Sequence, residues 1–77
     1  MKKAPFDLII ANILAAPLVE MADDLVAQCD TRGHVILSGM LADQADKVLA
    51  CYNARGLTLR EKYNIGEWST LLLQRDS

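Results

Sequence analysis

The feature that most constrains this chain is a short, almost uninterrupted apolar run, FDLIIA, over Phe6–Ala11. A run of this length without polar alternation is typical of a strand that is buried on both faces of a parallel sheet. Asn12 follows the run directly, and Pro17 then suits the first turn of a helix. The sequence therefore predicts an α/β fold that opens with a buried parallel strand and a helix.

The middle of the chain continues this alternation of strands and helices. Apolar residues recur every three or four positions over Pro17–Cys29, which predicts an amphipathic helix that ends at Asp30–Gly33. A second strand is predicted at His34–Ser38. Gly39 is expected to turn the chain into a second helix over about Leu41–Arg55.

The last part of the chain predicts two antiparallel strands. Leu57–Tyr63 alternates apolar and polar residues, Asn64–Glu67 is typical of a hairpin turn, and Trp68–Arg75 returns as a strand. The order is strand, helix, strand, helix, strand, strand, so the first two strands should be parallel, with a right-handed crossover. Both helices should then cover the same face of the sheet. Nothing in this sequence covers the other face, as expected for half of a larger doubly wound domain.

Length and charge limit the classes of function. Seventy-seven residues allow one small domain, so residues 1–77 are predicted to form a single domain. Ten acidic and eight basic residues give a net charge of −2, which argues against direct nucleic-acid binding and polybasic membrane binding. No apolar run approaches the roughly 20 residues that span a bilayer. Met1–Lys3 could begin a signal peptide, but we expect none, because Asp7 follows soon after and no small-residue cleavage site ends a clean apolar core. We expect a cytoplasmic protein.

The two cysteines do not predict a metal site. Cys29 and Cys51 both fall in segments that are predicted to be helices, and the single His34 is near neither of them in sequence. Three ligands without metal-ligand spacing are too few for a structural zinc site. We expect two buried, reduced thiols instead.

Asn12 and Ser38 are the candidate site residues. Asn12 comes just past the carboxyl end of the first strand, where open α/β sheets bind their ligands. Its amide both donates and accepts hydrogen bonds and has no charge to titrate, which suits an amine or the edge of a cofactor. The alternative, which spacing alone favours, is that Asn12 caps or turns into the following helix. Ser38 ends the second strand and could likewise reach the crevice or cap the turn.

Three other polar or aromatic residues are weaker candidates. Asp7 belongs to the start of its strand, away from the ligand edge. His34 is interpreted as a surface residue, because no carboxylate is placed to partner it as a general base. Trp68 is interpreted as a packing residue of the hairpin, with no derived chemical role.

Three stretches carry a resemblance to a known family: DLIIANILAAPLVEMA, GHVILSGMLADQADKVLACY and EKYNIGEWSTLLLQR. They are similar to the carboxyl-terminal part of the PrmA family, the methyltransferases of ribosomal large-subunit protein eleven. These enzymes use S-adenosylmethionine to methylate amino groups. The short motifs N-I-L-A, S-G-M-L and E-W are together specific for this family. The resemblance covers nearly the whole chain.

The resemblance implies a Rossmann-like methyltransferase sheet of seven strands, of which this chain supplies the fourth to the seventh. It also implies that Asn12 lines the cofactor and substrate site, and Ser38 is a candidate for substrate binding. Asn12 stands where other amino-group methyltransferases carry a D/N-P-P-Y motif, but no Pro-Pro-Tyr follows it here. The cofactor's Gly-rich turn is missing too, since no G-x-G occurs.

The functional interpretation is a fragment of an S-adenosylmethionine-dependent methyltransferase that acts on amino groups of a ribosomal protein. We expect the chain alone to bind no cofactor and to be inactive. The alternative is a stand-alone, non-enzymatic α/β interaction module that homodimerises through its bare sheet face or edge. A homodimer of this chain is expected under either interpretation.

Overall fold

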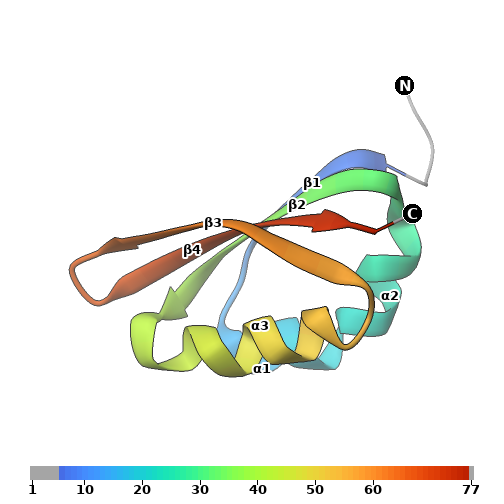
Figure 1. The fold of residues 1–77 in the computed structure, drawn as a ribbon. Helices are drawn as coiled ribbons and strands as arrows, with labels where there is room; N and C mark the ends of the chain where they lie inside the picture. Colours follow the sequence, from blue (N-terminus) through green and yellow to red (C-terminus); the bar gives the residue numbers. More distant parts are fainter. Residues whose placement is uncertain (1–5, 77) are drawn as a thin grey trace.

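A computed structural model describes residues 6–76 and shows one sheet covered by one layer of helices (Figure 1). The expectation for Met1–Lys3 lies outside the described residues. The elements in chain order are β1 (Phe6–Asn12), α1 (Ala15–Glu20), α2 (Ala22–Gln28), β2 (Cys29–Leu41), the 3-10 turn η1 (Ala42–Gln44), α3 (Ala45–Asn53), β3 (Leu57–Ile65) and β4 (Trp68–Arg75). The predicted α/β class is confirmed.

The sheet is mixed, with the strand order β1-β2-β4-β3. The predicted parallel pairing of the first two strands and the terminal antiparallel hairpin are both present. However, β4 returns between β2 and β3 and pairs antiparallel with β2, so only one pair of strands is parallel. This order buries Leu71 and Leu73 of β4 in the centre of the sheet. It leaves the charged segment Arg60–Lys62 of β3 on an edge, where charge discourages pairing with other chains.

The predicted helix over Pro17–Cys29 is wrong in two respects. It is divided at Met21, so that α1 buries Leu18 and α2 separately buries Leu25 against the sheet. It also ends at Gln28, because Cys29 already pairs with Phe6 as the first residue of β2.

The second predicted strand is much longer than expected. The structure extends it to Cys29–Leu41, so Asp30–Gly33 and Gly39 lie within β2 instead of stopping or turning the chain. Irregular register at both ends of β2 accommodates these residues. No helix in the described part of the chain has the length and apolar character that crossing a membrane requires.

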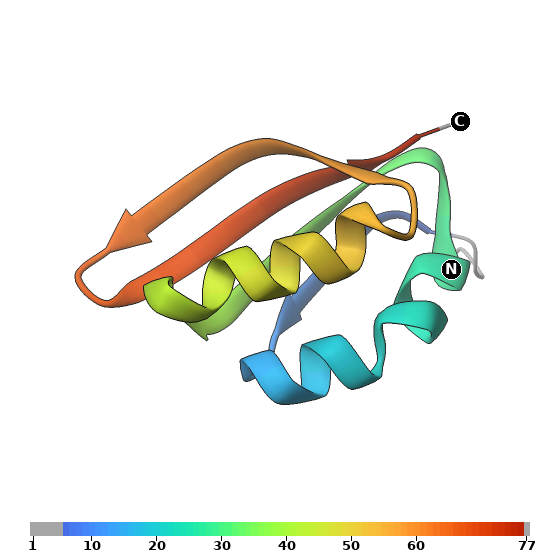
Figure 2. The same cartoon turned by 60° about the horizontal axis from the view of Figure 1, so that its bottom comes forward.

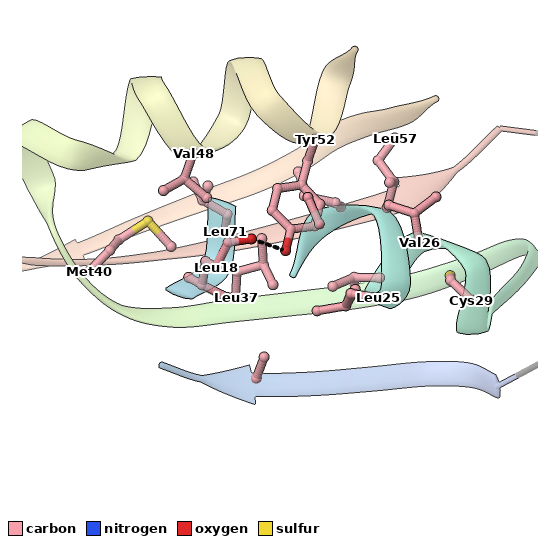
Figure 3. Close-up of a cluster of buried hydrophobic side chains, with 14 of the residues drawn as sticks. Leu18, Leu25, Val26, Cys29, Leu37, Met40, Val48, Tyr52, Leu57 and Leu71 are labelled. Carbon is pink, nitrogen blue, oxygen red and sulfur yellow. Dashed lines mark hydrogen bonds between the residues drawn. The ribbon is translucent and has the colours of Figure 1, made fainter. Parts of the chain in front are cut away.

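All the helices lie on one face of the sheet, as predicted (Figures 1 and 2). The hydrophobic core lies between the two layers. Tyr52 of α3 is fully buried at the centre of this core, and its hydroxyl donates a hydrogen bond to the carbonyl oxygen of Leu18 at 2.8 Å (Figure 3). Both cysteines are free, but only Cys29 is buried, whereas Cys51 is half-buried.

The opposite face of the sheet is uncovered by the described residues and exposes apolar side chains of β1. Along β1, Ala11 is buried, whereas Leu8 and Ile10 are 52% and 67% exposed. This alternation is the two-residue period of a strand, with one face towards the helices and the other towards solvent. The bare face predicted from the order of elements is therefore present.

Candidate functional site

A pocket of about 470 Å³ lies at the carboxyl ends of β1 and β2. Because β4 runs antiparallel to β2, its first residues reach the same edge of the sheet. The lining comes from all three strands and the segment after β1: Asn12, Ile13, Leu14, Ser38, Gly39, Trp68, Ser69 and Thr70. This is the edge at which open α/β sheets bind ligands.

The two residues predicted from the sequence, Asn12 and Ser38, lie side by side in this pocket. They are direct partners in the register of β1 and β2, and Ile13 N donates a hydrogen bond to Ser38 O at 3.0 Å. Asn12 does not cap the following helix, because the N-cap position of α1 is Leu14 and no side chain bonds there. The capping alternative for Asn12 is therefore wrong, and its exposed side chain lines the pocket.

Gly39 allows β2 to approach Asn12. Its φ of +89° is in the region that favours glycine, and it lies where the register of β2 with β4 shifts between Leu37 and Met40. A Cβ atom at this position would come within 2.9 Å of both the nitrogen and the oxygen of Ile13. For this wall of the pocket to form, residue 39 must therefore lack a side chain and adopt a left-handed backbone conformation.

The first residues of β4 also line the pocket, which the sequence did not predict. Trp68 is 53% exposed and is one of these lining residues, and its role as a packing residue of the hairpin stays a prediction. Ser69 is 1% exposed, and its hydroxyl makes no hydrogen bond within the described residues. Thr70 adds a second hydroxyl-bearing residue. No local sequence signal identifies these residues, because it is the antiparallel return of β4 beside β2 that brings its first residues to the ligand edge.

The other two weaker candidates, Asp7 and His34, lie outside the pocket. Asp7 is at the start of β1, five residues or roughly 17 Å from Asn12 along the strand. His34 pairs with Leu8 and Gln74 in the sheet and is not part of the pocket lining. Among residues 6–76, no three His, Cys, Asp or Glu side chains gather closely enough to hold a metal ion.

The pocket lining combines amide and hydroxyl groups with apolar side chains and carries no titratable side chain. Its amide and hydroxyl groups can hydrogen-bond an amine without an ion pair that would hold the amine protonated. The Trp68 ring adds an aromatic wall that can contact a cationic or methylated group. The perturbed groups lie elsewhere: burial raises the pKa of the Cys29 thiol and raises that of Tyr52 to about 12. The arrangement suits binding and orientation more than proton transfer.

Comparison with known proteins gives one consistent result. The family model described as ribosomal protein L11 methyltransferase (PrmA) matches residues 1–76. The ribosomal protein L11 methyltransferase of Agrobacterium fabrum is 51% identical over 97% of this chain and 26% of that protein. The enzyme of the same name from Rhizobium meliloti is 54% identical over 92% of this chain and 24% of its own length. The chain thus spans about a quarter of the length of these curated relatives.

Solved structures agree with this result. A ribosomal protein L11 methylase from Lactobacillus delbrueckii subsp. bulgaricus superposes with a TM-score of 0.86 and 32% identity, over 94% of this chain and 38% of that one. A methyltransferase from Pyrococcus furiosus, at 18% identity and a TM-score of 0.67 over 96% of this chain and 42% of its own, shares the fold. Because the family model covers nearly the whole sequence, this chain belongs to the ribosomal protein L11 methyltransferase (PrmA) family.

Proposed function

We propose that this chain forms one wall of the active site of an S-adenosylmethionine-dependent methyltransferase whose substrate is an amino group of ribosomal protein L11. The names of its relatives support the reaction and the substrate. The observation that carries the proposal is the pairing of Asn12 with Ser38, at the ligand edge of the sheet and inside a pocket. Since the chain spans about a quarter of its relatives' length, the complete activity belongs to a longer protein.

The role of Asn12 in this proposal is to orient the amine. Its amide oxygen accepts a hydrogen bond from an amine N–H, which directs the nitrogen lone pair away from Asn12 and towards the methyl donor. The Ser38 hydroxyl assists as a second polar contact. Such positioning supplies a large share of the catalysis of a transfer reaction. Asn12 remains neutral throughout, so the amine must reach the pocket already deprotonated or lose its proton to another group.

The pocket fits part of S-adenosylmethionine. This cofactor supplies an electrophilic methyl group on a sulfonium, and the uncharged lining presents no carboxylate to compete for it. The space that a Cβ atom on Gly39 would fill is occupied by Asn12 and Ile13, so Gly39 holds these two residues close to β2 at the wall of the pocket. No G-x-G turn occurs in the sequence, however. We therefore propose that cofactor binding also needs segments that this chain does not contain.

A second candidate function is that of a non-enzymatic module that homodimerises. The observation that favours it is the exposed apolar surface of Leu8 and Ile10 on the bare face of the sheet. In addition, β1 is an edge strand of the sheet. Pairing of this edge or face with a second copy would bury both features.

Replacement of Asn12 by alanine in the longer methyltransferase tests the proposal. We expect methyl transfer to fall tenfold or more, on the order of 1.4 kcal/mol in activation free energy, with little change in thermal stability. The matched control is Asn53→Ala, which removes the same side chain from an exposed position at the end of α3. Unchanged turnover together with a lower melting temperature would show that Asn12 has only a structural role.

A further inference from the structure

A second polar pocket lies at the other end of the sheet. Its volume is about 200 Å³, and three of the five residues that line it are arginines: Arg32, Arg60, Gln74, Arg75 and Asp76. Ser69 of the candidate active site and Arg75 are both in β4, six residues or about 20 Å apart along the strand (Figure 1). The two pockets are therefore separate, and the candidate active site does not explain the arginine cluster.

Gln74 organises the cluster with both ends of its amide. Its Nε2 donates a hydrogen bond to Arg32 O at 2.9 Å, and its Oε1 accepts one from Arg60 Nε at 2.9 Å. A single residue of β4 thus holds the backbone of β2 on one side and a guanidinium of β3 on the other. This arrangement positions Arg60 before any ligand arrives and reduces the entropy that binding would cost.

One carboxylate, that of Asp76, lines the same pocket and balances only part of the positive charge of the cluster. None of the three arginines forms an ion pair with a described carboxylate. Nη1 of Arg75 donates hydrogen bonds to the neutral backbone carbonyls of Val26, at 3.2 Å, and Cys29. Asp76 accepts a hydrogen bond from the Thr58 hydroxyl at 2.9 Å. Three cations and one carboxylate leave a formal local charge of about +2 at the pH where all four are ionised.

The backbone of Arg32 adds a second observation. With a φ of 65°, Arg32 is the only non-glycine residue among residues 6–76 that is left-handed. This conformation is unfavourable for a residue with a Cβ atom, and glycine or asparagine adopts it more readily. Arg32 therefore places its guanidinium at this position in spite of an unfavourable backbone conformation.

We propose that this cluster binds a phosphate dianion, either free phosphate or a terminal phosphomonoester. Guanidinium groups bind tetrahedral oxyanions through paired, charge-assisted hydrogen bonds, and a dianion gains more from the local positive charge than a phosphodiester does. The small volume suits one phosphate group more than an extended nucleic-acid backbone. This proposal is independent of the methyltransferase function.

Titration of the full chain with inorganic phosphate, monitored by calorimetry at low ionic strength, tests the proposal. We expect saturable binding with a dissociation constant at or below the millimolar range. Arg60→Ala and Gln74→Leu should each weaken binding at least fivefold, the second by releasing Arg60. The matched control is Lys47→Ala, which removes one positive charge from an exposed position on α3 and should change the affinity less than twofold.

Arg32→Gly keeps the test decisive even if other variants fold poorly. It removes the guanidinium and also relieves the left-handed strain, so we expect equal or greater stability and at least fivefold weaker phosphate binding. Adenosine monophosphate, added in a parallel titration, distinguishes the sources, because only a site open to monoesters will bind it. The proposal is overturned if phosphate shows no saturable binding, or if Lys47→Ala weakens it as much as Arg60→Ala. It is also overturned if RNA without a terminal phosphate binds in place of phosphate.

Discussion

Gly39 and Asn12 are in such close contact that a Cβ atom on Gly39 would lie 2.7 Å from Oδ1 of Asn12. Real Cβ contacts essentially never come this close, so any larger residue at position 39 must displace the Asn12 side chain or the backbone after it. The glycine in β2 and the asparagine at the end of β1 therefore form one unit of the candidate site.

Gly39→Ala is expected to destabilise the chain by roughly 2–5 kcal/mol. Left-handed strain contributes about 1–2 kcal/mol and overpacking about 1–3 kcal/mol. The matched control is Gly56→Ala, because Gly56 has a nearly identical φ of +86° but no neighbouring atom within 4 Å of the added Cβ. Urea unfolding of both variants isolates the steric contribution. Equal losses of stability in the two variants would mean that the structure around Asn12 accommodates the added methyl group with no further loss of folding free energy.

Tyr52→Phe should destabilise the chain by about 1–3 kcal/mol, because it leaves the Leu18 carbonyl without the hydrogen bond that Tyr52 donates at 2.8 Å. Burial also raises the pKa of Tyr52 from 10.0 to about 12. The neutral hydroxyl is the form that the fold stabilises, so this contribution is complete below pH 10 and is lost as the pH rises towards 12. The free energy of unfolding should fall more steeply over this range in the parent chain than in Tyr52→Phe. If the free energy of unfolding depends on pH in the same way in both proteins, the assignment of this pH dependence to Tyr52 is wrong.

The 77-residue chain alone should not bind S-adenosylhomocysteine measurably. The reason is that its sequence contains no G-x-G turn to supply backbone amides for the cofactor. Calorimetric titration provides the measurement, with a longer family member that contains the Gly-rich turn as the positive control. Binding in the low micromolar range, about −8 kcal/mol, would refute the view that this chain supplies only part of the site.

The chain is expected to form homodimers, or to aggregate at high concentration, through its bare sheet face and the β1 edge. Ile10→Lys should suppress this association, because Ile10 is 67% exposed on that face. The control is Ile65→Lys, which places the same charge at an 80% exposed position near the hairpin turn. Sedimentation equilibrium over a hundredfold range of concentration measures the mass. A single 8.5 kDa species throughout would exclude self-association.

Much of the fold follows from local patterns in the sequence. The apolar run at Phe6–Ala11 predicts β1, and the turn at Asn64–Glu67 predicts the hairpin, because neither requires knowledge of distant contacts. The position of Asn12 at the ligand edge follows from the same logic, since a parallel strand's carboxyl end is set by the chain direction. The family resemblance is also evident from the sequence alone, because contiguous motifs carry it.

Other features were decided only by tertiary contacts. The return of β4 between β2 and β3 depends on which apolar strand best fills the centre of the sheet, and this brings Trp68 to the pocket. The division of the first predicted helix at Met21 depends on how Leu18 and Leu25 pack against a shared sheet. Hydrophobic periodicity reports which residues become buried, but not which surface buries them.

The arginine cluster shows this limit most clearly. The net charge of −2 gives no indication of a local cluster of positive charge, yet Arg32, Arg60 and Arg75 come together from three strands. The sequence by itself determined the charges, the strand at Phe6–Ala11 and the neutral amide at its end. Only the tertiary structure decided which charges became neighbours, because electrostatic interactions depend on distance in space and not on separation along the chain.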